Sequence, residues 1–432
     1  MAPPQERPAR RPLFDFEGAD KRLVLWAAAL NFFLLASYYI LRPVRDEIFA
    51  SYVGMRANLF LHTFLATVFA AGSFAALTRA VSRRRLVAGT LFFLALNLIA
   101  FQIWLPSTQT ANESPPLIER AFYVWVTIFG LVGVSIIWSL ITDSFKSAQA
   151  KGVFGLFFFG STLGANLASL FVIGTATTLE RSGLLATAAG LAVLAAFCAL
   201  RIGGLSPHQH GKADPSTEPL SGKLRAGFAA IATSPQLRRI CLYLATYTFG
   251  STLLYYAKGD MVRAEFTDRD LRTAFYASLN LYVGLACLVP QLFLTNRTIG
   301  RIGLGGTLMI LPMLSAIGFG LLALIPSFTL IVVFESARRS LNFIFAKPAR
   351  EVLFTGVTTQ DRFQAKPIID TVWYRGTDWV AAELLETLAL APTANAWLGV
   401  PAALAGALLG RRLGQAHDET LQETPPGGPA DH

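Results

Sequence analysis

The chain has 432 residues, of which 53% are hydrophobic and 15% are charged, and its mean hydropathy is +0.48. This composition excludes an ordinary water-soluble globular domain and is typical of a membrane protein. The formal net charge of +10 is explained by basic loops beside anionic lipid, and no nucleic-acid-binding module is readable in the sequence. We therefore expect the lipid bilayer, and no nucleic acid, as the large partner of this chain.

The two ends of the chain, residues 1–21 and 413–432, are predicted to be disordered cytoplasmic tails. Both are polar and contain several Pro residues, so they carry too little apolar surface to form a packed structure. The apolar stretch that follows the first tail is too long for the core of a signal peptide. It is therefore predicted to be the first membrane span.

Apolar stretches of about 20 residues, the length that crosses a bilayer, recur along the chain. We predict twelve spans, at residues 22–41 (with a possible extension to 53), 57–78, 86–105, 121–142, 152–176, 182–201, 237–257, 273–294, 303–325, 328–347, 367–392 and 394–410. Lys and Arg gather in alternate connections, near residues 7–22, 79–85, 146–151, 201–239, 297–301, 347–366 and 411–412. Because cytoplasmic loops collect these residues, we expect a multi-pass protein of the inner membrane with both termini in the cytoplasm.

A short internal repeat divides the chain into halves. Leu77-Thr78, Arg84 and Gly89-Thr90-Leu91 recur 217 residues later as Leu294-Thr295, Arg301 and Gly306-Thr307-Leu308. The repeat predicts an N-terminal six-helix bundle at 22–201, a cytoplasmic linker at 202–236 and a C-terminal six-helix bundle at 237–412. The expected fold class is an all-α membrane protein with twelve transmembrane helices in two six-helix bundles, the major facilitator type, whose substrate site lies between the halves at the bilayer midplane.

The first span runs directly into the charged string Leu41-Arg42-Pro43-Val44-Arg45-Asp46-Glu47. An arginine at the centre of a bilayer costs roughly 2.5 to 3.5 kcal/mol, so such residues usually face protein or a polar path. Tyr38, Arg42 and Arg45 recur at helical spacing and share one face. The alternative is that both arginines extend to the membrane surface and pair there with Asp46 and Glu47.

The tenth and eleventh spans also carry internal charge. Glu335 precedes Arg338 and Arg339 by three and four residues, which favours ion pairs within the helix, and Asn342 follows one turn later. The charges further along are Arg350, Glu351, Lys366, Asp370, Arg375 and Asp378. The alternative to a binding role is a salt-bridge network that locks or gates the bundle, and alternating access needs such a gate.

Positive charge dominates these spans and predicts an anionic substrate. Guanidinium groups bind carboxylate and phosphate oxygens in pairs and keep their proton when partly dehydrated. The predicted substrate-binding residues are Arg42, Arg45, Arg338, Arg339, Arg350, Tyr38 and Asn342. The predicted gating or coupling residues are Asp46, Glu335, Glu351, Lys366, Asp370, Arg375 and Asp378.

At these positions the sequence resembles the ATP/ADP translocase family, the nucleotide exchangers of intracellular bacteria and plastids. Leu41-Arg42-x-x-Arg45-Asp46 is similar to that family's Leu-Arg-x-x-Lys-Asp, with Arg in place of Lys. Pro348-x-Arg350-Glu351, followed by Lys366, Asp370 and Arg375, is similar to its Pro-x-Lys-Glu, Lys-x-x-x-Asp and following Arg. The resemblance implies ATP/ADP-type exchange, with Arg42, Arg45 and Arg350 binding the phosphates.

Three hypotheses follow from the sequence. The first is an organic-anion transporter, most specifically a nucleotide exchanger that acts as a monomer. The second is a proton-coupled or efflux facilitator for another solute, in which Asp370 or Asp378 titrates. The third is a membrane enzyme or receptor, and an enzyme is disfavoured because no His-rich cluster, nucleophile motif or metal-ligand spacing is readable. We therefore expect no enzyme activity, no metal and no cofactor.

Overall fold

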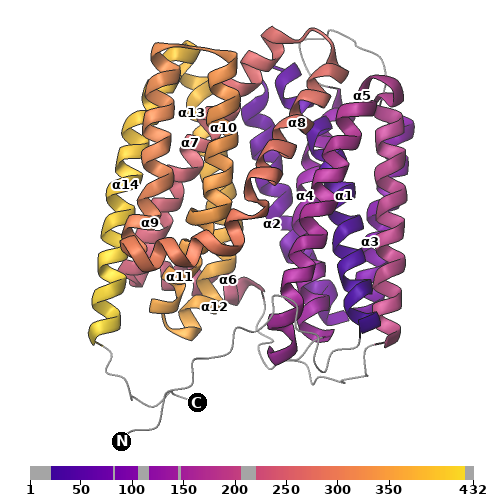
Figure 1. The fold of residues 1–432 in the computed structure, drawn as a ribbon, viewed down its shortest axis with the longest axis horizontal. Coiled ribbons are helices and arrows are strands. Elements are labelled where there is room, and N and C mark those ends of the chain that lie inside the picture. Colours follow the sequence, from indigo (N-terminus) through magenta and orange to yellow (C-terminus); the bar gives the residue numbers. More distant parts are fainter. Residues whose placement is uncertain (1–20, 81–82, 106–115, 145–146, 206–219, 424–432) are drawn as a thin grey trace, which may run out of the picture.

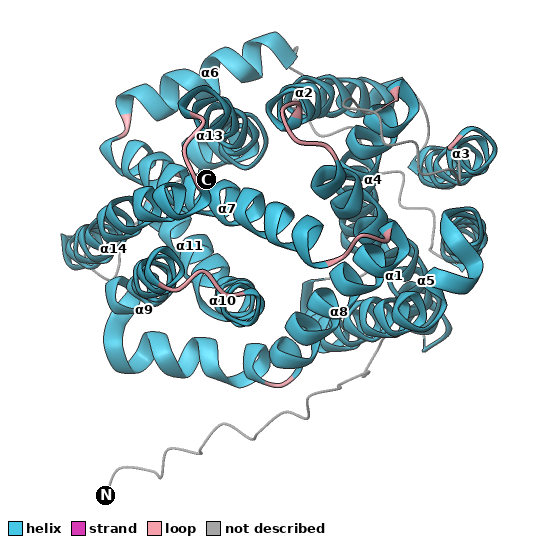
Figure 2. Cartoon of the chain, turned by 90° about the horizontal axis from the view of Figure 1, so that it is seen from above, coloured by secondary structure: helices cyan, strands magenta, loops and turns pink. Residues whose placement is uncertain are grey.

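The computed structural model describes residues 21–80, 83–105, 116–144, 147–205 and 220–423. Every regular element in this part of the chain is a helix (Figure 2). The first helices are α1 (Lys21–Ser51), α2 (Arg56–Ala80), α3 (Arg83–Trp104), α4 (Leu117–Ser144) and α5 (Ser147–Leu205). α5 contains the fifth and sixth predicted spans, which meet at Glu180, where φ is 53°. We refer to α1–α5 as the N half.

A short helix, α6 (Leu220–Thr233), lies within the predicted linker. The remaining helices are α7 (Pro235–Glu265), α8 (Arg269–Leu288), α9 (Pro290–Leu324), α10 (Phe328–Leu341), α11 (Lys347–Leu353), α12 (Thr359–Ile368), α13 (Tyr374–Leu388) and α14 (Pro392–Glu423). π-helical turns join α10 to α11 at Asn342–Ala346 and α12 to α13 at Ile369–Trp373, and a 3-10 turn, Phe354–Gly356, follows α11. We refer to α7–α14 as the C half.

The described helices form the twelve predicted spans. The eighth span consists of α8 and the start of α9, which changes direction at Gly303 (φ 72°), and Figures 1 and 2 show this first part of α9 running sideways. By length and composition alone, six stretches of the described helices are apolar enough to cross a membrane, and the one from Phe159 to Ile202 holds two spans. The other spans include those that carry Lys258, Arg338 and Arg375.

Several helices extend past the ends of the predicted spans. The helix of the tenth span runs on to Leu353, that of the eleventh begins at Thr359, and α14 continues to Glu423, so residues 413–423 are helical and not the disordered tail that was predicted. Leu413 is fully buried, so this polar extension is held by packing that hydropathy does not reveal. The rest of the predicted tails, residues 1–20 and 424–432, lies outside the described residues.

The two halves stand side by side (Figure 1). They meet where α5 and α1 contact α8, where α2 contacts α13, and where α1 contacts α7. α1 begins and α14 ends at the same end of the molecule, which we call the termini end. The other is the opposite end.

Small residues set the position of α1 in the N half. α5 approaches α1 so closely that a Cβ added at Gly164 would lie 2.4 Å from the carbonyl oxygen of Phe32, and one at Gly160 would lie 2.9 Å from that of Ala28. Such contacts between backbones let helices pack tightly in a membrane. They fix the helix that carries the charged string.

Candidate substrate-binding site

The charged string of α1 faces protein where the two halves meet. Arg45 donates from Nε and Nη2 to Oδ1 of Asp46 at 3.0 and 2.6 Å, and Arg42 Nε lies 3.9 Å from the other carboxylate oxygen. Tyr255 of α7 donates to the same Asp46 at 2.8 Å, and Asp46 is only 3% exposed. The string is therefore part of the junction between the halves, where its charged groups have partners from both α1 and α7.

Glu335 pairs with Lys258 of α7 at 2.8 Å, and not with the neighbouring arginines as predicted. Lys258 also lies 4.8 Å from the ring centroid of Tyr255 and 5.6 Å from that of Tyr276, distances that suit cation–π attraction. The sequence prediction missed Lys258 because it ended the seventh span at residue 257, whereas α7 continues to Glu265. The ion pair thus joins α7 to α10 within the C half.

Arg338 lies inside the C half. It donates to the hydroxyl oxygens of Ser251 and Ser315 at 2.9 and 3.2 Å and to the carbonyl oxygen of Tyr247 at 3.0 Å. It borders a cavity of about 20 Å³ enclosed by α7, α9, α10 and α14. All three nitrogens of its guanidinium group therefore have acceptors within one half, and the structure does not bring Arg338 to the junction.

Arg339, the next residue, faces the junction. It donates to the amide oxygen of Asn280 on α8 at 2.9 Å. Arg339 lies one helical turn after Glu335, whose partner Lys258 lies 4.8 Å from the centroid of the Tyr255 ring. The Tyr255 hydroxyl donates to Asp46, which lies 3.9 Å from Arg42 Nε on α1. Asn342 begins the π-helical turn that follows α10. This chain of contacts brings the like charges of Arg42 and Arg339 to the same junction from opposite halves.

Aromatic rings line the same face of α1. Tyr38 stacks on Phe129 with 6.4 Å between ring centroids, and Tyr39 lies 5.8 Å from Tyr38 and 5.9 Å from the Arg42 guanidinium. These rings supply flat apolar surface next to cationic groups. They surround the arginines of α1 with a mixed aromatic and basic environment.

The other predicted site residues form two separate groups in the C half. Towards the termini end, Arg350 lies 3.8 Å from Asp370, and Lys366 pairs with Glu351. A pocket of about 410 Å³ lies beside them and is lined by Glu351, Phe354, Arg362, Phe363, Lys366, Pro367 and Asp370. On α13, Arg375 lies 3.5 Å from Asp378, which accepts a hydrogen bond from Thr252 at 3.1 Å. The predicted residues therefore do not form one constellation.

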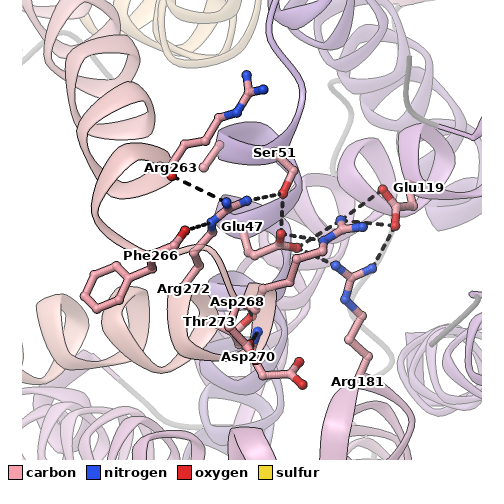
Figure 3. A network of polar contacts seen from close by, with 12 residues as sticks. Glu47, Ser51, Glu119, Arg181, Arg263, Phe266, Asp268, Asp270, Arg272 and Thr273 are labelled. Atoms are coloured by element: carbon pink, nitrogen blue, oxygen red, sulfur yellow. Dashed lines mark hydrogen bonds and ion pairs between the residues drawn. The ribbon is translucent and has the colours of Figure 1, made fainter. Parts of the chain in front are cut away.

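A buried network closes the junction at the opposite end (Figure 3). Arg181 of α5 binds Glu47 and Glu119 at 2.6 and 2.7 Å, and both carboxylates are almost fully buried. Arg269 of α8 binds the same two carboxylates at 2.7 and 3.2 Å. Because α8 belongs to the C half and the other three residues to the N half, Arg269 ties the halves together.

Further contacts join the halves beside this network. Arg56 of α2 lies 2.6 Å from Asp260 of α7 and also donates to the carbonyl oxygens of Phe49 and Ala50. Arg272 of α8 donates to the Ser51 hydroxyl at 3.0 Å. In the part of the chain that the structure describes, every ion pair between the halves lies at this end. The structure is thus a state closed at the opposite end.

The loop after α1 covers the network. Burial, and then the neighbouring Glu119 carboxylate, raise the pKa of Tyr52 to about 12. Tyr52 therefore remains a neutral phenol at physiological pH and adds no charge to the buried cluster.

Among the described residues, no group of three or more His, Cys, Asp or Glu side chains is placed to hold a metal ion.

Most residues of this network were not predicted, although the sequence contains a signal for them. Arg56, Arg181, Arg269 and Arg272 lie on the connections that the positive-inside rule expects to be poor in Lys and Arg. An arginine that violates the rule at the margin of a span is a candidate for a buried ion pair. That criterion selects all four.

Comparisons with known proteins identify the fold. No family model and no curated protein matches the chain. Among solved structures, the peptide transporter PepTSo of the POT family has a TM-score of 0.62 at 12% identity, and the alignment covers 92% of this chain and 98% of that one. The xylose transporter XylE from E. coli gives 0.58 at 14% over 90% and 96%, and the nucleoside transporter NupG gives 0.57 at 14% over 92% and 99%.

These similarities confirm the predicted fold class. The chain is an all-α membrane protein with twelve transmembrane helices in two six-helix bundles, the major facilitator fold. At identities of this size the similarity concerns the fold and not the substrate. The resemblance to the ATP/ADP translocases remains a prediction.

Proposed function

We propose that this protein is a membrane transporter that moves an organic anion by alternating access between its two halves. The observation that carries this proposal is the surplus of positive charge at the junction. Arg42, Arg45, Lys258 and Arg339 gather there with two carboxylates, Asp46 and Glu335. An anion is the ligand that such a site accommodates best.

The fold supports a transport role. The similar structures are described as transporters of peptides, xylose or nucleosides, and in such folds the site between the bundles faces one side of the membrane at a time. The ion pairs that Arg269 and Arg56 make across the junction would break when the opposite end opens. We further propose that the termini end faces the cytoplasm, because Lys and Arg gather in its loops.

We propose a nucleotide of the ATP/ADP type as the transported anion. The basic string of α1 would receive the phosphates, and the rings of Tyr38 and Tyr39 offer a surface on which a base can stack. The resemblance of Arg42, Arg45 and Arg350 to the translocase motifs supports the same substrate. In this proposal the protein exchanges one nucleotide for another.

One observation favours a second candidate, a proton-coupled facilitator for another solute. Asp378 is 5% exposed and lies in the middle of the eleventh span, with Thr252 and Arg375 as its partners. A buried carboxylate in a transporter is a candidate proton carrier. Uptake driven by a pH gradient, without a counter-substrate, would distinguish this candidate from the exchanger.

The substrate class can be tested in vesicles that contain the purified protein and internal ATP. Uptake of labelled ATP is measured with external ATP, ADP or uncharged adenosine as competitor. We expect ATP and ADP to compete and adenosine to have little effect, because only the nucleotides carry phosphate. Equal competition by adenosine would exclude an anion site, and absence of uptake with any nucleotide would exclude nucleotide exchange. Arg239→Gln, which removes an exposed arginine of α7, is the matched control.

A further inference from the structure

We infer that Arg42 and Arg339, from opposite halves, hold one oxyanionic group of the substrate between them, with the Asn280 amide as a third donor. This inference rests on the proposed function and assigns its binding residues. Arg339 and Asn280 belong to α10 and α8, so the site is complete only when both halves contribute. The structure provides three lines of support.

The first line is charge. Arg45 binds Asp46 through two hydrogen bonds, and Lys258 pairs with Glu335. Arg42 keeps only a long contact of 3.9 Å to Asp46, and the hydrogen-bond partner of Arg339 is a neutral amide. Each carboxylate at the junction is therefore already bound by another cation. The positive charge of Arg42 and Arg339 is the part that is left without close compensation.

The second line is the supply of hydrogen-bond acceptors. Arg42 Nε and Asn280 Nδ2 are buried and have no acceptor among the described residues. A buried donor without an acceptor is destabilising, so such groups in a folded protein call for an explanation. Asn280 itself is 1% exposed, and its amide oxygen is already used by Arg339. The site has donors in excess, and a ligand rich in acceptors would satisfy them.

The third line is the contrast with Arg338. This neighbour of Arg339 is equally basic, but each of its three nitrogens has an acceptor inside the C half. Of these two arginines, only Arg339 bonds to α8, the helix of the C half that contacts α1. Arg338 is a positioning residue for α10 and not a ligand-binding residue in this assignment.

The arrangement of the donors selects the class of anion. They come from α1, α8 and α10, and therefore from more than one direction. A carboxylate has two oxygens in one plane, whereas a phosphoryl or sulfuryl group has at least three arranged tetrahedrally. We assign the site to a tetrahedral oxyanion, because such a group can accept from all three helices at once.

The site also links binding to movement. When it is empty, Arg42 and Arg339 repel each other across the junction, which opposes closure of the halves around the site. A bound oxyanion removes this repulsion and lets the occupied protein cross between its two states. The pair therefore makes crossing depend on the anion, which is the property that exchange requires.

Binding can be tested on the purified full-length protein with inorganic phosphate, sulfate and acetate at constant ionic strength. We expect phosphate and sulfate to raise the melting temperature and acetate to raise it much less. Arg339→Gln and Arg42→Gln should weaken the phosphate effect at least tenfold, whereas Arg239→Gln should leave it unchanged. A phosphate affinity that both Arg339→Gln and Arg42→Gln retain would overturn the inference.

Asn280→Asp is a second variant that nearly preserves side-chain volume. Its carboxylate would supply the missing acceptor and neutralise Arg339, so we expect weaker phosphate binding and a higher melting temperature without phosphate. Stronger or unchanged phosphate binding in Asn280→Asp would contradict the inference. If wild-type protein transports anions while these variants still bind phosphate, the inference fails and the proposed function stands. If wild-type protein neither binds nor transports any anion, both fail.

Discussion

Arg269 and Glu47 form a two-point ion pair between the halves, with Arg269 Nε 2.7 Å from one carboxylate oxygen and Nη2 3.1 Å from the other. Two parallel hydrogen bonds fix both the distance and the angle between the groups. Glu47 is fully buried, so its charge depends on the two arginines that reach it. This relationship makes Glu47 the best position at which to disturb the closed state.

Glu47→Gln should lower the stability of the protein and open the junction at the opposite end. The variant leaves Arg181 and Arg269 with too little negative charge, and removal of one partner from a buried pair typically costs about 3 to 5 kcal/mol. Adding Arg269→Gln to this variant should restore part of the loss, because the charges again balance. Melting temperatures of the two single variants and the double variant measure this coupling. Strict additivity would show that Arg269 and Glu47 do not act as a pair.

Arg56 and Asp260 should respond unequally to substitution. Asp260 has a side chain that is 38% exposed, so Asp260→Asn should cost no more than about 1 kcal/mol. Arg56 is 1% exposed and also satisfies two carbonyl oxygens, so Arg56→Gln should cost clearly more. Thermal unfolding of both variants tests this difference. Equal losses would show that the carbonyl contacts of Arg56 contribute nothing.

The Lys258 and Glu335 pair should behave as a unit. Lys258→Met alone leaves a buried carboxylate, and Glu335→Gln alone leaves a buried ammonium group, so each should destabilise the C half. The double variant should be more stable than either single variant. The folded yield and the melting temperature of the three variants measure their order of stability. A double variant that is less stable than both would indicate that Lys258 and Glu335 have other essential partners.

Asp378→Asn separates the two candidate mechanisms. The amide retains an oxygen that can accept from Thr252 but cannot carry a proton. If the protein is an exchanger, nucleotide exchange should continue at a comparable rate in this variant. Loss of transport in correctly folded Asp378→Asn protein, together with loss of pH-gradient dependence, would favour the proton-coupled facilitator.

The fold was largely predictable, because crossing a bilayer imposes a length and a hydropathy on each span. The predicted seventh span ended one residue before Lys258, because a charged residue lowers the hydropathy of the segment that contains it. Lys258 is nevertheless buried in α7, because it has a partner on another helix. Glu335 accepts from Lys258 across 77 residues of sequence, and helical spacing alone favoured nearer arginines. Local periodicity predicts neighbours on one helix and not partners on another.

The candidate site was predictable only in part. The arginines of α1 and α10 were selected because charge within a span is unusual. Sequence reasoning could not separate Arg338 from Arg339, because the direction in which each side chain points depends on how α10 rotates against α7 and α8. Nor could it assemble the network around Glu47, whose partners Arg181 and Arg269 are 134 and 222 residues away. Arg350, Lys366 and Asp370 were expected at the same site as the arginines of α1 and α10. They lie instead towards the termini end, on α11, on α12 and in the π-helical turn that follows α12, respectively.

Uptake of labelled ATP into vesicles with and without internal nucleotide tests whether the proposed exchange is obligatory. Purified protein is reconstituted into both kinds of vesicle, with Arg239→Gln as the matched control for loss of an arginine. We expect rapid uptake into loaded vesicles and almost none into empty ones, for wild-type protein and control alike. In Arg339→Gln, uptake into loaded vesicles should fall towards the low uptake into empty ones. Equal uptake by the wild-type protein into loaded and empty vesicles would exclude obligatory exchange.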